Sequence, residues 1–427
     1  MEKIRSGQSF LYREAGYTST VIDVRMKDKI RGDYLCRALD KALERYPYFK
    51  SKLVEKNGEF YFEEDYISMV AVKTDKSRIL GNMSTGYHLL DVTYTANKIC
   101  VSFHHALCDG RGIKPFIETL IYYYCCLKYN KKLDSTGIRL ADEPLLAGET
   151  AEPFGTDFFP VNKDNVFEVS RDGFQLPEHA EDKGNHYRTE ININQPQFIA
   201  FAKANNATPA ILLSMIISDS IKKLYPDADK PIVCSMASDY RHEIGMDNTH
   251  KNCVGSIYLP YSDETEKLSL PEQATMYREL VKKQKSPDSV KASLNAQIGL
   301  YNKLDTITGL KEKRKMMSFL NDICINTYVI SYLGQFHLES CRDYIESMHL
   351  YSSGTKGLII NMISVGDCIS LDILQQFESD NIIKAIMNSF DAIGVDYSAK
   401  ERILFETKKD KAFKTASWQA ERFYKLQ

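Results

Sequence analysis

Two adjacent histidines and a nearby aspartate are the residues whose types and spacing could do chemistry. The stretch KICVSFHHALCDGRGI, residues 98–113, places His104 beside His105, with Asp109 and Gly110 shortly after. A neutral imidazole has a pKa near physiological pH, so it can take a proton from a hydroxyl or amine and pass it on. His105 stands last on the apolar side of a strand pattern, where its ring can project into a cleft. The stretch therefore indicates general-base catalysis.

The two imidazoles cannot both serve one substrate while the strand stays regular, because successive side chains point to opposite faces. One face carries Ile99, Val101, Phe103 and His105, and the other carries Cys100, Ser102 and His104. We expect His105 to act as the base and His104 to support it.

Two other interpretations compete with catalysis. A metal site is the first, but neighbouring strand histidines diverge and no HExxH or second spaced histidine pair occurs, so we expect no metal. The second is that both histidines are satisfied core groups at a strand end, the usual state of an arbitrary histidine. The close spacing to Asp109 and Gly110 favours catalysis. Gly110 permits backbone angles that other residues resist, Asp109 can bond local amides, and a buried Asp109 would need a cation.

Helices and strands alternate around this motif. The spacing of apolar residues between 35 and 46 predicts a helix, and Asn57-Gly58 and the residues near 96–97 predict two hairpin turns. A second amphipathic helix begins after Gly112. The second half is predicted to contain a helix with Thr208 as N-cap, a charged helical stretch near 271–320, and strands. The expected strands are HYRTEININ, KPIVCSMASDYR, NCVGSIYLPY, ICINTYVISYLG and DCISLDILQ.

The stretch 133–185 loses periodicity and collects proline, glycine and acidic residues, so it is the best candidate for a boundary. We predict an α/β fold of mixed sheets in two subdomains, residues 1–165 with the histidine motif and residues 166–427.

Composition excludes several classes of protein. The 427 residues are 43% hydrophobic and 26% charged, with 55 basic and 57 acidic residues, so no global field attracts nucleic acid or an acidic membrane. The N-terminus lacks the apolar core of a signal peptide, and no apolar run is long enough to span a membrane. Ten scattered cysteines without a CxxC pair indicate free thiols and a cytoplasmic protein.

The motif HHALCDG resembles the HHxxxDG motif of the chloramphenicol acetyltransferase-like superfamily, which includes condensation domains, microbial alcohol acetyltransferases and plant BAHD acyltransferases. Three further stretches resemble that family's segments in the family's order, over nearly the whole chain. They are ALDKALERYPYFKSKL, SDYRHEIGMDNTHKNCVG and VISYLGQF.

The resemblance implies two subdomains of similar fold with a tunnel between them, entered by a thioester from one side and by the acceptor from the other. It implies that His105 is the general base for direct acyl transfer and that Asp109 pairs with Arg241. VISYLGQF would add substrate-binding residues at Ser331, Tyr332 and Gly334. No permanent cofactor is implied, since acyl-CoA or acyl-phosphopantetheine is a substrate.

Departures from the family favour a free-standing acyltransferase similar to alcohol acetyltransferases, expected to be a monomer. The DFGWG motif of the plant branch is absent, and the chain carries no carrier-protein serine motif and no adenylation signature. Two alternatives stay open, a stand-alone condensation enzyme acting on carrier-bound substrates and a non-catalytic binding protein on the same fold. The basic runs ELVKKQKS and GLKEKRKMM could hold CoA phosphates or a carrier helix, or could be solvated helix faces.

Overall fold

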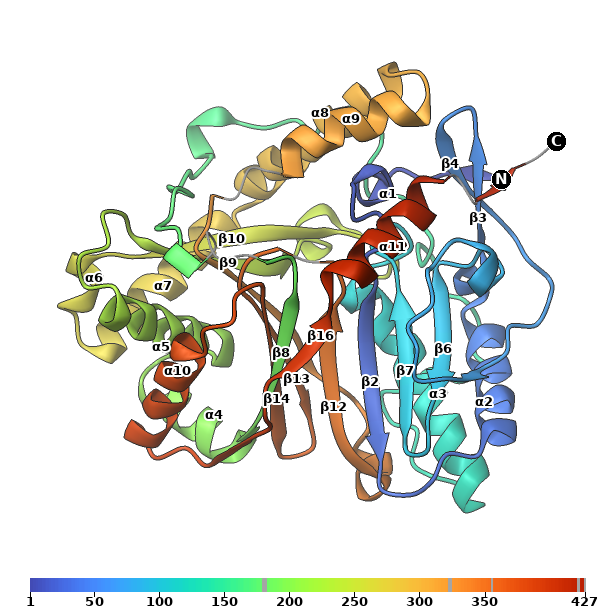
Figure 1. Cartoon of the computed structure of the whole chain (residues 1–427), viewed down its shortest axis with the longest axis horizontal. Helices are drawn as coiled ribbons and strands as arrows, with labels where there is room; N and C mark the ends of the chain where they lie inside the picture. The colour runs from blue at the N-terminus through green and yellow to red at the C-terminus, as the bar shows by residue number, and fades with distance from the viewer. Residues whose placement is uncertain (179–182, 322–324, 355, 421–422, 426–427) are drawn as a thin grey trace.

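Two mixed sheets stand side by side, with helices around them (Figure 1). The computed structural model describes residues 1–178, 183–321, 325–354, 356–420 and 423–425. The first sheet has the order β12-β2-β7-β6-β5 and holds the strand that leads to the histidines. Its strands are β12 (Ile345–Ser352), β2 (Thr20–Met26), β7 (Lys98–Phe103), β6 (Leu90–Tyr94) and β5 (Val72–Lys73).

The second sheet has the order β10-β9-β11-β13-β14-β8-β15, with β16 also paired to β8. Its central strand β11 runs parallel to both β9 and β13. The strands are β10 (Val254–Tyr261), β9 (Ile232–Asp239), β11 (Tyr328–Gln335), β13 (Ile359–Val365), β14 (Cys368–Gln375), β8 (His186–Asn194), β15 (Tyr397–Ala399) and β16 (Ile403–Glu406). A smaller sheet joins β1 (Glu2–Lys3), β4 (Glu59–Glu63), β3 (Lys52–Lys56) and β17 (Tyr424–Lys425).

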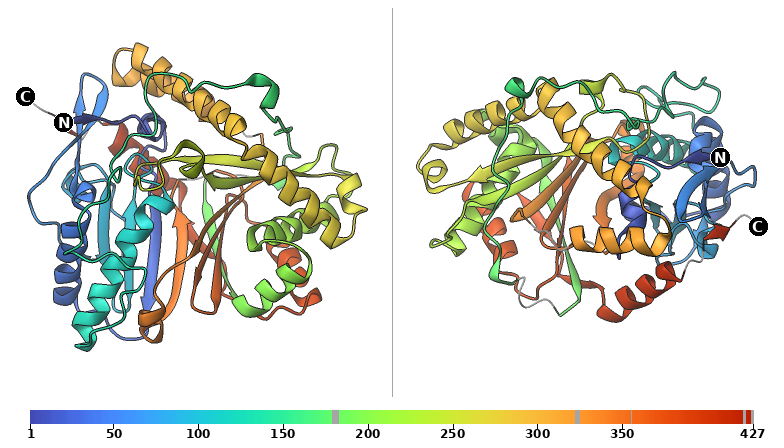
Figure 2. Two further views of the ribbon diagram at one scale, coloured as in Figure 1. Left: turned by 180° about the vertical axis from the view of Figure 1, so that it is seen from behind. Right: turned by 90° about the horizontal axis from the view of Figure 1, so that it is seen from above.

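Each large sheet carries its own helices and its own apolar core. On the first sheet, α2 (Gly32–Arg45) and α3 (Gly110–Tyr129) pack together, as Figure 2 shows from behind. The second sheet is covered by α4 (Gln195–Ala204), α5 (Pro209–Leu224), α7 (Leu270–Gln284) and α10 (Asn381–Ala392). Across the top of Figure 1 lie α8 (Pro287–Thr306) and α9 (Leu310–Asn321), near the short α1 (Gln8–Tyr12), and α6 (Asp263–Glu266) lies at the far left. The C-terminal α11 (Lys408–Gln419) runs across the front.

The second half of the chain completes the first sheet. Strand β12 pairs with β2 at the edge of that sheet and lies against β13 and β14 of the second sheet. We call this contact the central seam. Helix α8 and Trp418 of α11 also bury their apolar side chains in the first core. The first core therefore contains residues from both sides of the predicted boundary at 165/166. The boundary itself stays a prediction.

Most predicted elements are confirmed. Both hairpins form, with Asn57 and Gly58 at positive φ in the first turn, and the side chain of Thr208 caps α5. The stretch 133–185 contains no helix longer than a single 3₁₀ turn and no strand among its described residues. Strands β12 and β13 had no counterpart in the prediction, because their nearly continuous burial removes the alternation that marks a half-buried strand. The expected strand ICINTYVISYLG begins partly outside the described residues.

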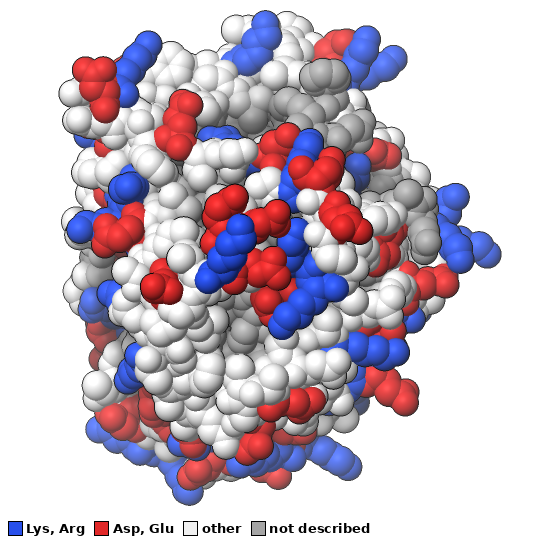
Figure 3. Space-filling model, turned by 90° about the vertical axis from the view of Figure 1, so that its left-hand side faces the viewer, with Lys and Arg blue, Asp and Glu red and all other residues white. Residues whose placement is uncertain are grey.

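The surface agrees with the balanced composition. Figure 3 shows acidic and basic side chains intermingled on one end of the molecule, consistent with a formal net charge of −2. Among the described helices, none is long and apolar enough to cross a membrane. The nine cysteines within the described residues are free.

Helix α3 approaches the second half of the chain so closely that one position tolerates no side chain. A Cβ added to Gly112 would lie 2.0 Å from the carbonyl oxygen of His250, a backbone atom that cannot turn away. We predict that Gly112→Ala lowers the free energy of unfolding by about 1–3 kcal/mol, because overpacking forces the backbone to shift. Urea unfolding measures the change.

The matched control is Gly299→Ala, within α8, where the added Cβ would meet only the edge of Phe158 at 3.9 Å. Alanine should stabilise that helix interior by about 0.5–1 kcal/mol. If Gly112→Ala were at least as stable as the wild-type protein, the close approach at Gly112 would not be a constraint in solution.

Candidate active site

The histidine pair lies in the loop that joins β7 to α3. Strand β7 ends at Phe103, earlier than the sequence pattern predicted, so His105 begins the turn instead of ending the strand. The N–H of His104 still bonds the carbonyl of Leu89, but the His104 carbonyl accepts the N–H groups of Leu107 and Cys108. The chain therefore turns at this point, and the two imidazoles diverge because of the turn as well as the strand.

The ring of His104 is fully enclosed. Only 1% of the residue is exposed, and the ring stacks on Trp418 with centroids 6.1 Å apart. Its Nδ1 accepts the N–H of Ala106 at 3.0 Å, and its Nε2 lies 3.0 Å from the carbonyl of Gly16. Since Nδ1 accepts, Nε2 carries the proton and donates it to that carbonyl. Burial lowers the pKa of His104 to about 3. His104 is thus a neutral group that joins the loop to the N-terminal segment.

His105 is half-buried and less fully bonded. Phe10 stacks on one face of its ring at 4.9 Å, and Phe103 meets it edge-on at 6.2 Å. Its Nε2 lies 3.4 Å from the hydroxyl of Thr20, which also contacts Ser352. Its Nδ1 is buried without a hydrogen-bond partner among the described residues. The Nε2 atom is therefore the one that faces exchangeable hydroxyl groups.

The environment of His105 favours the neutral ring. Burial lowers its pKa from the ordinary value, the charge of Arg13 lowers it further, and Asp109 raises it in part. A histidine with a lowered pKa is unprotonated at neutral pH, the state in which it can accept a proton.

Both carboxylate oxygens of Asp109 accept hydrogen bonds from structural partners. It is the N-cap of α3, and its Oδ1 accepts the N–H of Gly112 at 2.8 Å. The same oxygen accepts from Arg241 at 2.8 Å, and Oδ2 accepts the N–H of Cys253 at 2.8 Å. With 3% of the residue exposed, Asp109 holds the loop and does not face a substrate.

Arg241 forms the other side of the predicted ion pair. Its guanidinium donates to Asp109 and Asp239 at 2.8 Å each, and to the carbonyls of Thr249 and Lys251 at 2.8 and 2.6 Å. Burial lowers the pKa of Arg241, but the two carboxylates outweigh it and the net shift is upward. The ion pair that sequence comparison predicted is present, between the motif loop and the connection from β9 to β10.

That connection, residues 240–253, binds the motif loop at two more points. The side-chain amide of Asn252 donates to the carbonyl of His105 at 3.1 Å. The Nδ1 of His250 lies 3.0 Å from the carbonyl of Gly112. The backbone of His105 is therefore positioned by a segment from the second half of the chain.

Gly110 has a different role from the one predicted. It is the first residue of α3 and is not among the glycines with positive φ, so unusual backbone angles are not the reason for it. A Cβ at this position would lie 2.1 Å from a methyl group of Leu333. The requirement is space, where α3 begins against β11.

The predicted binding residues Ser331, Tyr332 and Gly334 lie on that same strand. All three are half-buried, although β11 is central in its sheet. The hydroxyl of Tyr332 is 3.2 Å from that of Ser364. Gly334 has φ +74° at a register shift between β11 and β13, and no atom would contact an added Cβ. The strand is therefore interrupted where it reaches the motif loop.

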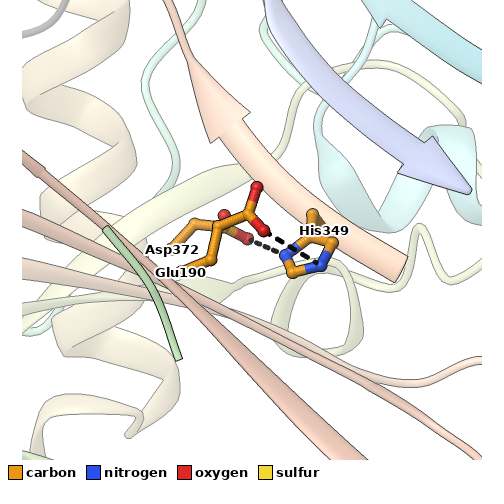
Figure 4. Close-up of side chains that lie close together, drawn as sticks. All are labelled: Glu190, His349 and Asp372. Atoms are coloured by element: carbon orange, nitrogen blue, oxygen red, sulfur yellow. Dashed lines mark hydrogen bonds and ion pairs between the residues drawn. The ribbon is translucent and has the colours of Figure 1, made fainter. Parts of the chain in front are cut away.

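A second group of ionisable side chains, mostly buried, lies at the central seam. It consists of Asp23 and Arg25 of β2, Arg188 and Glu190 of β8, His349 of β12, and Asp372 of β14. Figure 4 shows the carboxylates of Glu190 and Asp372 close together and facing the His349 ring from the same side, at 3.8 Å from Nε2 and 3.2 Å from Nδ1.

These three side chains are the one group within the described residues whose ligand atoms are close enough for a metal ion. The sequence had not singled them out. Both oxygens of Glu190 accept from Arg25, and Asp372 accepts from Arg188 at 2.6 Å. A cation would have to displace these guanidinium groups, so the cluster is better explained as an ionic contact between the two sheets.

Within the same cluster, a serine, a histidine and an aspartate lie next to one another in the order found in a catalytic triad. Ser347 Oγ lies 3.1 Å from Nε2 of His349, whose Nδ1 faces Asp372. However, Ser347 is 5% exposed and His349 and Asp372 are 0% exposed. A nucleophile must be reached by its substrate, so this arrangement does not form an active site in this state.

Two cavities flank the motif loop and the seam. One of about 420 Å³ is lined by residues of both sheets, including Arg25, Lys98 and Arg188. The other, of about 400 Å³, is lined by Arg111, Lys114 and other residues around the start of α3. Neither is lined by His105, so a continuous tunnel to this residue stays a prediction.

Several residues of the site were missed at the level of sequence. Phe10, Arg13 and Thr20 come from the N-terminal segment, and Trp418 comes from the last helix. No local pattern marks them, because they reach the loop only through tertiary packing. Trp418, as the single tryptophan, was the one available signal.

No family model matches the chain, and no curated protein is similar to it in sequence. Solved structures do match. TRI101 of F. sporotrichioides, solved with coenzyme A and T-2, is 11% identical with a TM-score of 0.60, over 93% of this chain and 98% of that one. Polyketide synthase associated protein 5 of Mycobacterium tuberculosis is 13% identical with a TM-score of 0.58, over 91% and 96%.

The condensation domain of the monacolin K polyketide synthase MokA is 11% identical with a TM-score of 0.55, over 92% of this chain and 96% of that one. These likenesses show the fold. The same fold occurs in TRI3, a trichothecene 15-O-acetyltransferase of Fusarium sporotrichioides, which is 11% identical with a TM-score of 0.58 over 92% of this chain and 94% of that one. A fold shared with an acetyltransferase and a condensation domain is what the resemblance to the chloramphenicol acetyltransferase-like superfamily predicted. A fold alone does not fix an activity.

We predict that Asp109 and Arg241 are strongly coupled. Arg241→Gln leaves the buried Asp109 without a cation and should lower the free energy of unfolding by about 3–5 kcal/mol. Asp109→Asn should cost less, because the guanidinium of Arg241 keeps Asp239 as a partner. The double variant should lose less than the sum of the two losses. Urea unfolding of the four proteins measures the coupling.

The exposed pair Arg31 and Asp33, 2.9 Å apart, is the control with the same chemistry. Its cycle should show little coupling, because solvent screens exposed charges. Additive losses at Asp109 and Arg241 would mean that the two groups do not interact in solution.

Proposed function

We propose that the protein is an acyltransferase that moves an acyl group from a thioester to an alcohol or amine, with His105 as general base. The observation that carries the proposal is the contrast within the histidine pair. His104 is fully bonded and enclosed, whereas His105 is half-buried, has a lowered pKa and directs Nε2 toward hydroxyl groups. The fold shared with acetyltransferases supports this role.

In the proposed reaction, Nε2 of His105 accepts the proton of the acceptor's O–H or N–H as that atom attacks the thioester carbonyl. The C–S bond then breaks from the tetrahedral intermediate, and the leaving thiolate takes the proton from the imidazolium. The products are an ester or amide and a free thiol, and no acyl-enzyme forms. Transfer is direct because the histidine serves only as an acid and a base.

The other predicted site residues are given supporting roles. We assign Asp109, Gly110 and Arg241 to fixing the loop, and His104 to fixing the strand end against Trp418. We place Ser331, Tyr332 and Gly334 along the substrate path. The pairing of β11 with β13 is interrupted at these residues, and Leu333 of the same stretch contacts Gly110 of the motif loop. The donor is a substrate, so the reaction needs no resident cofactor or metal.

The donor is acyl-CoA or an acyl carrier protein. TRI101 was solved with coenzyme A, which supports the first, whereas the likeness to condensation domains supports the second. Incubating the protein with acyl-CoA or with a loaded carrier protein, and following thiol release, separates the two. Release with the carrier alone would favour the condensation enzyme.

We predict that His105→Ala lowers turnover about 10²–10⁴-fold while the protein keeps its fold, the usual effect of losing a general base. His104→Ala should instead lower the free energy of unfolding, because it removes two buried hydrogen bonds and the contact with Trp418. Thiol release and urea unfolding are measured for both.

His242→Ala is the control, since the His242 side chain is 89% exposed and its Nδ1 faces Asp247. A folded His105→Ala protein with wild-type turnover would contradict the mechanism. Absence of thiol release from the wild-type protein with every donor and acceptor would favour a binding protein on this fold.

A further inference from the structure

The N-terminal segment covers the candidate base. Gly7 lies so close to the loop that an added Cβ would be 2.2 Å from the carbonyl oxygen of His105. Helix α1 follows, and its Phe10 stacks on the imidazole of His105 at 4.9 Å with 27° between the ring planes. One face of the proposed base is therefore formed by α1.

Arg13 extends this stack by one more member. Its Cζ lies 4.4 Å from the centre of the Phe10 ring. Phe10, Arg13 and His105 are each half-buried, whereas Leu11 and Tyr12 between them are buried. The three members of the stack therefore keep part of their surface exposed beside the motif loop.

The guanidinium of Arg13 has no carboxylate partner among the described residues. Its Nε is buried without a hydrogen bond. Three more deeply buried arginines are each paired: Arg45 with Glu149, Arg188 with Asp372, and Arg5 with Asp305. A partly buried cation without a counter-ion is unfavourable, so the protein carries a cost in stability at this position.

The charge state of this region agrees with an unpaired cation. Burial lowers the pKa of Arg13, and the phenol of Tyr301 is the neighbour that opposes this shift. Arg13 in turn lowers the pKa of both His104 and His105. A substrate anion placed here would meet an arginine fork with free donors, next to the proposed base.

Distance restricts what that anion can be. The two steps of 4.9 Å and 4.4 Å place Cζ of Arg13 no more than about 9 Å from the centre of the His105 ring. A pantetheine arm has a backbone about as long as that of four residues, so when extended it separates a thioester sulfur from the nearest phosphate by about 15 Å. With the thioester at His105, the coenzyme phosphate lies beyond Arg13.

We propose that Arg13 binds a carboxylate carried by the acyl group or by the acceptor, and so selects an anionic substrate for the reaction at His105. The inference rests on the proposed acyl transfer, and it adds a substrate class to it. Three observations support this inference: the unpaired guanidinium, its stack with Phe10 and His105, and the reach of the pantetheine arm.

The test compares matched substrate pairs. Butyryl-CoA and succinyl-CoA have acyl chains of equal length without and with a carboxylate. Butanol against γ-hydroxybutyrate, and butylamine against γ-aminobutyrate, place the carboxylate on the acceptor. The wild-type protein should prefer one carboxylate-bearing partner by about 10–100-fold in kcat/KM, the range of a charge-assisted hydrogen bond. In Arg13→Gln the ratio should fall to near one.

The ratio separates binding from any effect of Arg13 on His105, because a changed base affects both members of a pair equally. Arg37→Gln removes an exposed arginine of α2 and should leave the ratio unchanged. Arg13→Gln and Arg13→Met should keep or raise Tm, since an unpaired buried charge is removed. An equal loss of activity with both members of every pair, or no preference in the wild-type protein, would overturn the inference.

Binding decides the question even if no substrate turns over. Calorimetry of butyryl-CoA and succinyl-CoA, and of each acceptor pair, with the wild-type protein and with Arg13→Gln does not require catalysis. Tighter binding of a carboxylate-bearing partner that depends on Arg13 would uphold the inference while the proposed reaction fails. Equal affinity within every pair, or no binding at all, would overturn it.

Discussion

The buried ion pair between Asp109 and Arg241 is the interaction on which the rest of the site depends. Asp109 caps α3 and begins the first helix after the histidines, whereas Arg241 belongs to the connection between two strands of the other sheet. Each is bonded by further groups, and loss of Arg241 would leave the buried Asp109 without a cation. The loop that carries His105 is thus fixed relative to both halves of the molecule, and Asn252 holds the His105 backbone from the same segment.

The two histidines of the motif loop differ in their surroundings. His104 has a bonding partner for each nitrogen and a ring contact with Trp418, so it behaves as part of the core. His105 has one weakly placed hydroxyl partner and a partly open surface. A second ionic contact joins the two sheets at the central seam, through Arg25 and Glu190. The sheets are therefore tied at two places, and the proposed chemistry lies next to one of them.

Short sequence patterns predicted those turns, caps and helices that depend on neighbouring residues. The Asn57-Gly58 turn, the Thr208 cap and the helix after Gly112 depend on a few neighbouring residues. The Asp109–Arg241 pair spans the chain and was predicted only because the motifs resemble a known family. Nothing in the sequence indicated that β12 crosses to the first sheet, or that α1 and α11 enclose the histidines, because those contacts form only when distant segments pack.

The central claim is that the ion pair holds His105 in a partly buried, neutral state. The most direct measurement is the pKa of the His105 side chain by NMR titration, in the wild-type protein and in Arg241→Gln. Burial and Arg13 lower the pKa of His105, so the wild-type ring should titrate below its ordinary value of about 6.5. Activity should then rise as the pH passes this lowered pKa and should reach its maximum by neutral pH. In Arg241→Gln the loosened loop admits water, and the pKa should move up toward 6.5. A wild-type pKa at or above 6.5, or one unchanged by Arg241→Gln, would contradict the account.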